Sequence, residues 1–345
     1  MKRWPIVVAA LGVLLVAALA GGAWKVERYA AAPLPVGEAG IGFEIVPGSS
    51  FARVSQELAD IGLVRHPVLL RIYARLHALD GRIHAGEYHI QPGSTVASLL
   101  EQFTSGDVRL YSFTLVEGWN RWDLLRALAG HPQIETTMSD EDWPALLEEL
   151  NADTLNPEGL FLPETYHFPR GTTDRKVLQQ AYTLMRSTLA EEWPDRAVGL
   201  PFDTPYEALV LASIVEKETA LADERARIAG VFVRRLENRM RLQTDPTVIY
   251  GIGPAFNGNL TRKDLRTDTV YNTYTRHGLP PTPIAMPGRD AIRAALNPAH
   301  GTELYFVATG LGDGSHKFSE TKEQHDAAVA EYLRRLRQRR NGGGE

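Results

Sequence analysis

An uncharged segment at the start of the chain constrains its architecture more than any other feature. Residues Trp4–Ala23 contain no ionisable side chain. At 1.5 Å per residue, a helix of about 20 residues crosses the ~30 Å hydrocarbon core of a bilayer. The charges that flank the segment are nearly balanced, so counting them does not fix its orientation. We predict a transmembrane anchor at residues 4–23, preceded by a cytoplasmic segment at residues 1–3.

A cleavable signal peptide is the alternative interpretation of this segment. Ala18-Leu19-Ala20 has the small-residue pattern of a cleavage site. The apolar run is long for a signal peptide, however, and the pattern lies inside it, so we favour the uncleaved anchor. Both interpretations carry the residues beyond about 25 across the membrane. No later stretch is long and apolar enough to span, and the remainder is expected to be water-soluble.

Composition excludes several classes of function. The chain has 345 residues, a formal net charge of −5 and no cysteine. This length allows about two domains. Without a basic block the chain is a poor candidate for binding nucleic acid. Disulfides, thiolate nucleophiles and cysteine metal sites are excluded, and no HExxH, G-x-S-x-G or phosphate-binding loop occurs. We therefore expect neither a metal nor a cofactor.

Short repeated patterns organise the first half of the exported part. Residues 24–40 mix Ala, Pro and Gly and are predicted to be a linker. A short strand, a Pro-Gly turn, a capping Ser or Thr and an amphipathic helix then follow one another twice, and a looser copy begins at Phe113. Residues 41–110 thus form a strand–helix–helix–strand unit that resembles the LysM fold of sugar-binding modules. A structural spacer would show the same pattern.

The following region is predicted to be mainly helical. Residues 111–200 have helical spacing and connect the small unit to residues 201–340. The aromatic stretch Phe161–Phe168 interrupts them. It suits either a sugar-binding wall or a packed hairpin, and we favour the packed hairpin. The chain should end in a flexible tail at residues 341–345. The fold class expected for the whole chain is α+β.

One glutamate stands out in the segment PYEALVLASIVEKETA. Glu218 continues the helical face formed by Leu211, Ile214 and Val215, so it should point toward the protein body. Burial raises the pKa of a carboxyl, and a protonated carboxyl can serve as a general acid. Glu216 lies roughly 160° around the helix and cannot form a close acid pair with Glu218. A buried ion pair or an exposed last-turn residue are the structural alternatives.

Two later segments are rich in hydrogen-bonding side chains. The first, RLQTDPTVIYG, contains Gln243 and Asp245, and the second, YNTY, contains Tyr271, Asn272 and Tyr274. A proline-rich stretch follows at HGLPPTPI. Such clusters suit a polar groove with rigid walls, although turn chemistry alone produces them as well.

Four motifs together resemble one known family. LASIVEKETA, RLQTDPTVIYG, YNTYTRHGLPPTPIAMPG and LYFVA with the later HKF occur in this order. They are similar to motifs of the YceG-like family of endolytic murein transglycosylases, and the resemblance covers about Phe43 to Leu336. It implies a LysM-like subdomain and a catalytic domain at residues 201–340. It also implies single-pass anchoring in the inner membrane, with the N-terminus in the cytoplasm and the catalytic domain in the periplasm.

The resemblance also implies a reaction and a set of residues. Glu218 matches the essential acid of the family. Residues that match the groove, with less certain roles, are Glu216, Gln243, Asp245, Tyr271, Asn272 and Tyr274. The expected substrate is the glycan strand of nascent peptidoglycan, cut between N-acetylmuramic acid and N-acetylglucosamine to leave 1,6-anhydro ends. Expected partners are penicillin-binding-protein synthases. The alternatives are a muramidase that uses water, or a non-catalytic glycan-binding scaffold.

Overall fold

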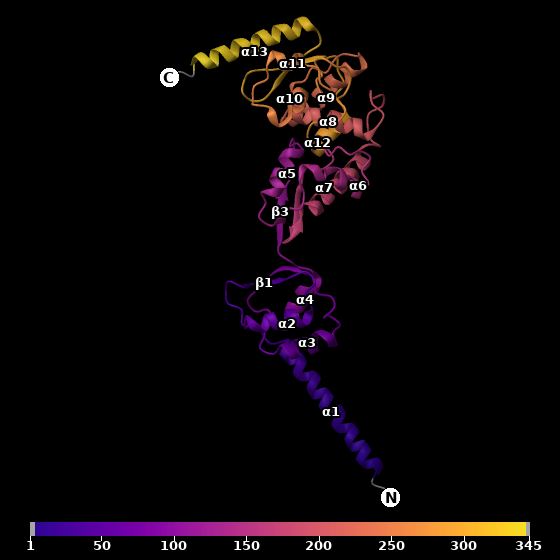
Figure 1. Cartoon of the computed structure of the whole chain (residues 1–345), viewed down its shortest axis with the longest axis vertical. Coiled ribbons are helices and arrows are strands. Elements are labelled where there is room, and N and C mark those ends of the chain that lie inside the picture. Colours follow the sequence, from indigo (N-terminus) through magenta and orange to yellow (C-terminus); the bar gives the residue numbers. More distant parts are fainter. Residues whose placement is uncertain (1–3, 343–345) are drawn as a thin grey trace. The chain divides into compact units, whose positions relative to one another are not determined.

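The structure, a computed structural model, describes residues 4–342 and divides into two compact units. The N-terminal unit extends to Tyr111 and includes His167–Gly171, and the C-terminal unit holds Ser112–Tyr166 and the residues from Thr172 onward (Figure 1). Both contain helices and short two-stranded sheets, which confirms the mixed α+β class. Residues 1–3, the predicted cytoplasmic segment, lie outside the described residues. The region predicted to connect the domains, 111–200, falls almost entirely in the same unit as residues 201–340.

Helix α1 contains the apolar segment and continues beyond it. It spans Trp4–Ala30, and its part from Val7 onward is long and apolar enough to cross a membrane. Val26, Ala30 and Leu34 are buried in the core of the N-terminal unit. Val26 and Ala30 are four residues apart and therefore lie on one face of the helix. This face packs into the core of the N-terminal unit. Residues 24–40 therefore differ from the predicted linker, because apolar contacts order them.

The N-terminal unit has the predicted strand–helix–helix–strand order. Its elements are β1 (Ile41–Ile45), α2 (Phe51–Asp60), α3 (Pro67–Leu76), β2 (Gly86–Ile90) and α4 (Val96–Ser105). Strands β1 and β2 are antiparallel, with Ile41 opposite Ile90. Ser50 and Thr95 cap α2 and α4, as the repeated pattern predicts.

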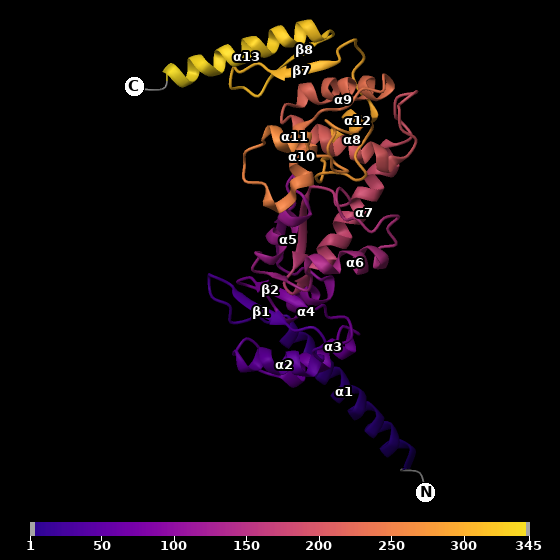
Figure 2. The same ribbon diagram turned by 45° about the horizontal axis from the view of Figure 1, so that its top comes forward.

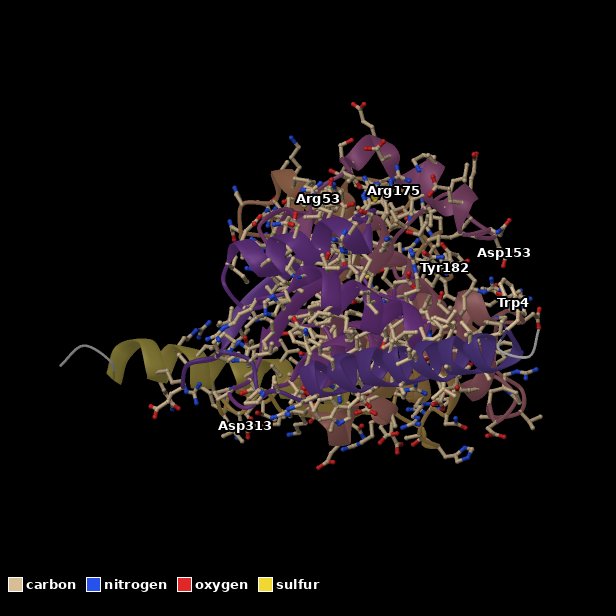
Figure 3. The ribbon with its side chains drawn as sticks, turned by 90° about the horizontal axis from the view of Figure 1, so that it is seen from below. Trp4, Arg53, Asp153, Arg175, Tyr182 and Asp313 are labelled. Atoms are coloured by element: carbon tan, nitrogen blue, oxygen red, sulfur yellow. The ribbon has the colours of Figure 1, made fainter. Side chains whose placement is uncertain are left out.

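Helix α2 shows how amphipathic spacing builds this unit. Phe51, Val54 and Leu58 are buried in the core, whereas Arg53 is exposed (Figure 3). Arg53 forms an ion pair with Glu57 one turn later. The apolar stripe therefore faces the core of the unit and the charges face solvent.

Strands β3 (Leu110–Thr114) and β5 (Thr165–Pro169) pair with each other, and the division between the units runs through them. Phe161, Tyr166 and Phe168 from the aromatic stretch are buried. The packed interpretation of this stretch is thus correct, although β5 pairs with a distant strand and forms no local hairpin.

The C-terminal unit is built around one buried helix. Its helices and short strands are α5 (Arg121–Ala129), β4 (Ile134–Glu135), η1 (Asp140–Asp142), α6 (Trp143–Glu149), β6 (Thr172–Thr173), α7 (Asp174–Glu192), α8 (Pro205–Glu218), α9 (Ala222–Glu237), α10 (Asp245–Ile252), η2 (Gly253–Ala255), α11 (Arg262–Arg266) and α12 (Arg289–Leu296). Every residue of α8 from Ala208 to Val215 is buried. Helices α9, α10 and α12 pack around α8. A helix enclosed on all sides holds its C-terminal residues in fixed positions.

Strands β7 (Tyr305–Ala308) and β8 (His316–Ser319) form an antiparallel hairpin next to α13 (Lys322–Gly342). Figure 2 shows the helix lying along this hairpin. The residues beyond Gly342, which belong to the predicted tail, lie outside the described part of the chain.

Candidate active site

The C-terminal end of α8 carries the glutamate that the sequence singles out. Thr204 caps the start of α8 through a reciprocal capping box with Glu207, and Pro205 occupies the first turn. The helix ends at Glu218, where Thr219 adopts an extended conformation. The buried body of the helix therefore directs the Glu218 carboxyl into the unit, as the helical spacing predicts.

Glu218 lines a cavity of about 500 Å³ in the C-terminal unit. The other lining residues come from α9, the segment at the start of α10, the loop between α11 and α12, the β7–β8 hairpin and α13: Arg235, Leu242, Gln243, Thr244, Asp245, Tyr274, Tyr305, Phe306, Val307, Ala308, His316, Lys322 and His325. Polar and ionisable groups dominate this wall. It joins segments that are about 100 residues apart in the sequence.

The surroundings of Glu218 favour its protonated form. Burial raises the pKa of this carboxyl, and the nearby Asp245 raises it further. A hydrogen bond from the Thr244 hydroxyl and the positive charges of His316 and Arg235 act in the opposite direction. The net pKa remains above its ordinary value. The carboxyl can thus hold a proton, and the Thr244 hydroxyl can stabilise the carboxylate once the proton has left.

Gln243, Asp245 and Tyr274 line the same cavity as Glu218. The Tyr274 hydroxyl donates to Asp245 Oδ1 at 2.6 Å. Burial and this bond to Asp245 both raise the pKa of Tyr274, which keeps the phenol protonated. Gln243 has a φ of 49°, in the left-handed region that few residues other than glycine adopt. This backbone conformation turns the chain between Leu242 and Thr244 at the edge of the cavity.

Three other predicted residues, Glu216, Tyr271 and Asn272, lie away from the lining of this cavity. The Tyr271 hydroxyl bonds the hydroxyl of Thr282 at 3.0 Å. Asn272 is 1% exposed, and its amide nitrogen donates to the carbonyl oxygens of Asp264, Leu265 and Thr267. Its amide oxygen accepts the backbone N–H of Tyr274 at 2.9 Å. Asn272 therefore shapes the loop that carries Tyr274.

Glu216 faces a different part of the unit from Glu218. Its carboxylate accepts the backbone N–H of Gly288 at 3.0 Å, at the start of α12. Burial raises the pKa of this carboxyl, and the bond from Gly288 opposes the rise. A carboxylate at a helix N-terminus stabilises that helix. The two glutamates are separated as the helical geometry predicts.

Three residues of the cavity that influence the Glu218 carboxyl were not selected from the sequence. They are Thr244, His316 and Arg235. His316 Nδ1 bonds the carboxylate of Glu224 at 2.7 Å, and its backbone N–H donates to the same group at 2.9 Å. Arg235 is buried and donates to the carbonyl oxygens of Leu242 and Leu304. The HKF motif marks His316, whereas no local pattern distinguishes Arg235 from other helix arginines.

Comparison with known proteins identifies the family. The profile of the YceG-like family matches residues 43–331. The chain belongs to the YceG-like family. It is 28% identical over 310 residues to a Bacillus subtilis protein named endolytic murein transglycosylase, with 85% of each chain covered. A Streptococcus pneumoniae protein of the same name is 29% identical over 322 residues, which are 84% of this chain and 58% of the pneumococcal one.

A solved structure also resembles this YceG-like chain. The crystal structure of a yceG-like protein from Listeria monocytogenes aligns with a TM-score of 0.52 and 26% sequence identity. The alignment covers 84% of this chain and 99% of the Listeria one. The family resemblance inferred from the four motifs is therefore confirmed.

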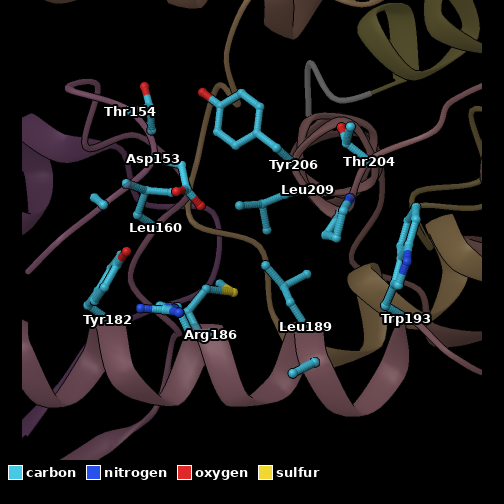
Figure 4. A pocket seen from close by; sticks show the side chains of 14 residues that line it. Asp153, Thr154, Leu160, Tyr182, Arg186, Leu189, Trp193, Thr204, Tyr206 and Leu209 are labelled. Atoms are coloured by element: carbon cyan, nitrogen blue, oxygen red, sulfur yellow. The ribbon is translucent and has the colours of Figure 1, made fainter.

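A larger cavity of the C-terminal unit, of about 570 Å³, lies elsewhere. Its walls come mainly from α7 and the start of α8, with Leu189, Trp193, Tyr206 and Leu209 among its apolar side chains (Figure 4).

Among the residues that the structure describes, no cluster of three or more His, Asp or Glu side chains is arranged to hold a metal ion.

Proposed function

We propose that this YceG-like chain is an endolytic lytic transglycosylase of peptidoglycan, with Glu218 as its catalytic acid. The observation that carries the proposal is the position of the Glu218 carboxyl in a polar cavity, where it accepts a hydrogen bond from Thr244 and where burial raises its pKa. The name shared by the Bacillus and Streptococcus relatives supports the substrate class.

The reaction begins with proton transfer to the leaving group. Glu218 protonates the glycosidic oxygen between N-acetylmuramic acid and N-acetylglucosamine, and the bond to the muramyl C1 breaks with oxocarbenium character. The Glu218 carboxylate then removes the proton of the muramyl C6 hydroxyl, whose oxygen attacks C1. A 1,6-anhydro ring forms, no water is consumed, and Glu218 ends the cycle protonated as it began.

The neighbours of Glu218 suit this alternation between acid and base. Burial favours the acid form, while the Thr244 hydroxyl and the His316 ring stabilise the carboxylate that exists between the two proton transfers. Gln243, Asp245 and Tyr274 would bind sugar hydroxyl and acetamido groups. Glu216, Tyr271 and Asn272 would act through the framework, since their side chains bond to other protein groups.

A muramidase is the second candidate, because Asp245 lies in the same cavity as Glu218. A second carboxylate could direct a water molecule to C1, as in ordinary glycoside hydrolases. The hydrogen bond from Tyr274 to Asp245 occupies one carboxylate oxygen, which favours a binding role for Asp245.

The apolar part of α1 supports a single-pass anchor in the inner membrane, with the N-terminus in the cytoplasm and the catalytic domain, residues 201–340, in the periplasm. The β1–α2–α3–β2 arrangement supports a LysM-like glycan-binding subdomain within residues 41–110. Penicillin-binding-protein synthases would be the partners that supply new glycan strands, whose elongation the cleavage would terminate.

The experiment is chemical. The full chain in detergent is incubated with purified sacculi, and the released muropeptides are identified by mass spectrometry. We expect products with 1,6-anhydro ends, which are lighter by one water than the corresponding reducing-end products. Reducing ends alone would establish hydrolysis and contradict the lytic reaction.

A further inference from the structure

Another cavity of the C-terminal unit, of about 370 Å³ and with both polar and apolar walls, is not used by the proposed reaction. We name it the Trp122 cavity. It is lined by Asn120, Trp122, Asp123, Arg126, Lys217, Pro246, Ile249, Tyr250, Gly253, Pro254, Phe256 and Ile284. Three aromatic rings and two cationic side chains thus border one hollow.

The Trp122 cavity borders the cavity of Glu218. At the end of α8, Lys217 lines the Trp122 cavity and Glu218 lines the other. At the start of α10, Pro246 lines the Trp122 cavity and Asp245 lines the Glu218 cavity. Residues that are consecutive in the sequence thus line the two cavities at the ends of α8 and α10, and consecutive Cα atoms are 3.8 Å apart. A polymer bound at Glu218 could therefore extend into the Trp122 cavity.

The aromatic wall of this cavity is held in place from several sides. Asn120 caps α5 by accepting the backbone N–H groups of Trp122 and Asp123. The Arg121 guanidinium lies 4.7 Å from the centre of the Trp122 ring, and Tyr250 lies 5.6 Å from it on another side. A rigid aromatic surface loses little conformational entropy when it binds a ligand.

A buried carboxyl fixes the base of the same wall. Glu158 is fully buried, and one of its oxygens accepts the backbone N–H of Arg121 at 3.2 Å. Burial raises the pKa of Glu158 to about 7. The backbone next to Trp122 is therefore positioned by a group from the distant segment Asn156–Gly159. This arrangement holds the aromatic wall in one conformation.

The charges at this cavity favour an anionic ligand. Lys217 Nζ donates to the carbonyl oxygen of Gly118 at 3.1 Å and makes no ion pair within residues 4–342. Arg126 is paired with Asp123 at 3.3 Å. Lys217 also interacts electrostatically with Glu216, but it is not ion-paired with that carboxyl, and a ligand carboxylate would complement the ammonium group.

We propose that the Trp122 cavity is a glycan subsite that binds a sugar residue together with the carboxylate-bearing peptide attached to the strand. Trp122 and Tyr250 would contact the apolar face of the pyranose ring, and Lys217 would bind a peptide carboxylate. This inference rests on the proposed function, because it assigns the cavity to the strand cleaved at Glu218.

The test separates binding from cleavage. Binding is measured by calorimetry with two probes in the full-length Glu218→Gln background, in which we expect cleavage to be strongly reduced. The first is a tetrasaccharide of alternating N-acetylglucosamine and N-acetylmuramic acid that carries its peptides, and the second is the same glycan without peptides. Trp122→Ala should weaken both by about tenfold, and Lys217→Gln should weaken the peptide-bearing probe alone by about fivefold.

Matched variants control for folding. Trp122→Phe retains an aromatic ring and should keep most of the affinity. Trp193→Ala removes a tryptophan from the larger cavity of the same unit and should leave both dissociation constants unchanged. If Trp122→Ala strongly lowers the melting temperature, the subsite is tested by Lys217→Gln instead. The Lys217 side chain is exposed, so its replacement should leave the fold intact.

The outcomes distinguish this inference from the proposed function. Sacculus digestion by the unmodified chain is measured in parallel. Anhydro ends together with unchanged affinities in Trp122→Ala and Lys217→Gln would overturn the subsite and leave the reaction intact. Reducing ends together with weakened binding in these variants would overturn the lytic reaction and support the subsite.

Discussion

Two cavities of the C-terminal unit differ little in size and greatly in chemistry. The larger, about 570 Å³, has mainly apolar walls from α7 and α8 (Figure 4), whereas the Glu218 cavity, about 500 Å³, gathers ionisable groups from six segments. In the larger one, Arg186 approaches the ring of Tyr182. In the smaller one, Thr244, His316, Arg235 and Asp245 all influence one carboxyl. Coupled ionisable groups indicate a catalytic site better than volume does.

Removing the proton of Glu218 should have the largest effect. Glu218→Gln cannot protonate a leaving oxygen, and we expect glycan cleavage to fall by a factor of about 10²–10⁴. Release of anhydro-muropeptides from sacculi measures this loss. Glu216→Gln is the matched control, because an amide oxygen can still accept the N–H of Gly288, and it should retain activity within about threefold. Equal losses in both variants would contradict the assignment of the acid.

The paired side chains at the edge of the Glu218 cavity should have a smaller effect. Asp245→Asn and Tyr274→Phe each weaken the hydrogen bond between these residues. We expect each to reduce kcat/KM by about tenfold, mainly through KM, because a charged hydrogen bond contributes about 1.5–3 kcal/mol. A loss in kcat as large as that of Glu218→Gln, in Asp245→Asn alone, would instead favour the muramidase.

The hydroxyl of Thr244 should set the pH dependence. Its hydrogen bond stabilises the carboxylate form of Glu218 and so lowers the pKa of that group. Thr244→Val removes the bond, and the pKa of Glu218 should rise. Since the acid acts when protonated, the decline of kcat/KM with increasing pH should move upward by about one pH unit. A pH–rate profile of both proteins measures the shift, and a shift to lower pH would contradict the arrangement described.

A substitution in the larger cavity should have the smallest effect on glycan cleavage. Trp193→Ala alters its wall at the end of α7 without touching the cavity of Glu218. We expect cleavage of sacculi to stay within about twofold of the unmodified chain. A loss of activity in a variant that keeps its melting temperature would show that the apolar cavity takes part in the reaction. This would contradict the contrast drawn between the two cavities.

Local patterns predict much of the fold and the direction of the acid. Turn and cap residues mark the starts of α2 and α4, and the spacing of apolar residues in α8 directs Glu218 inward. These features depend on neighbours within one or two helical turns, so a sequence displays them directly. The extension of α1 into a core was missed, because the apolar residues 26, 30 and 34 are scattered among Pro, Gly and charged residues.

The rest of the site depends on contacts between distant segments. Thr244 reaches Glu218 across 26 positions, and His316 meets Glu224 across 92. Asn272 has the same polar character as its neighbour Tyr274, but it is buried and bonded to backbone carbonyls. Only the path of the loop determines which of two polar residues, two positions apart, faces a cavity, and residue type does not reveal that path.

The unbroken path of α1 bears on how the chain reaches its substrate. If α1 is the membrane anchor proposed above, its uninterrupted path into a folded core would hold the attached unit rigidly, whereas a disordered linker would let that unit move over a wide radius. The N-terminal unit would then stand at a set height above the bilayer and diffuse with its anchor. Only glycan within that narrow layer would be within its range, close to where new strands emerge.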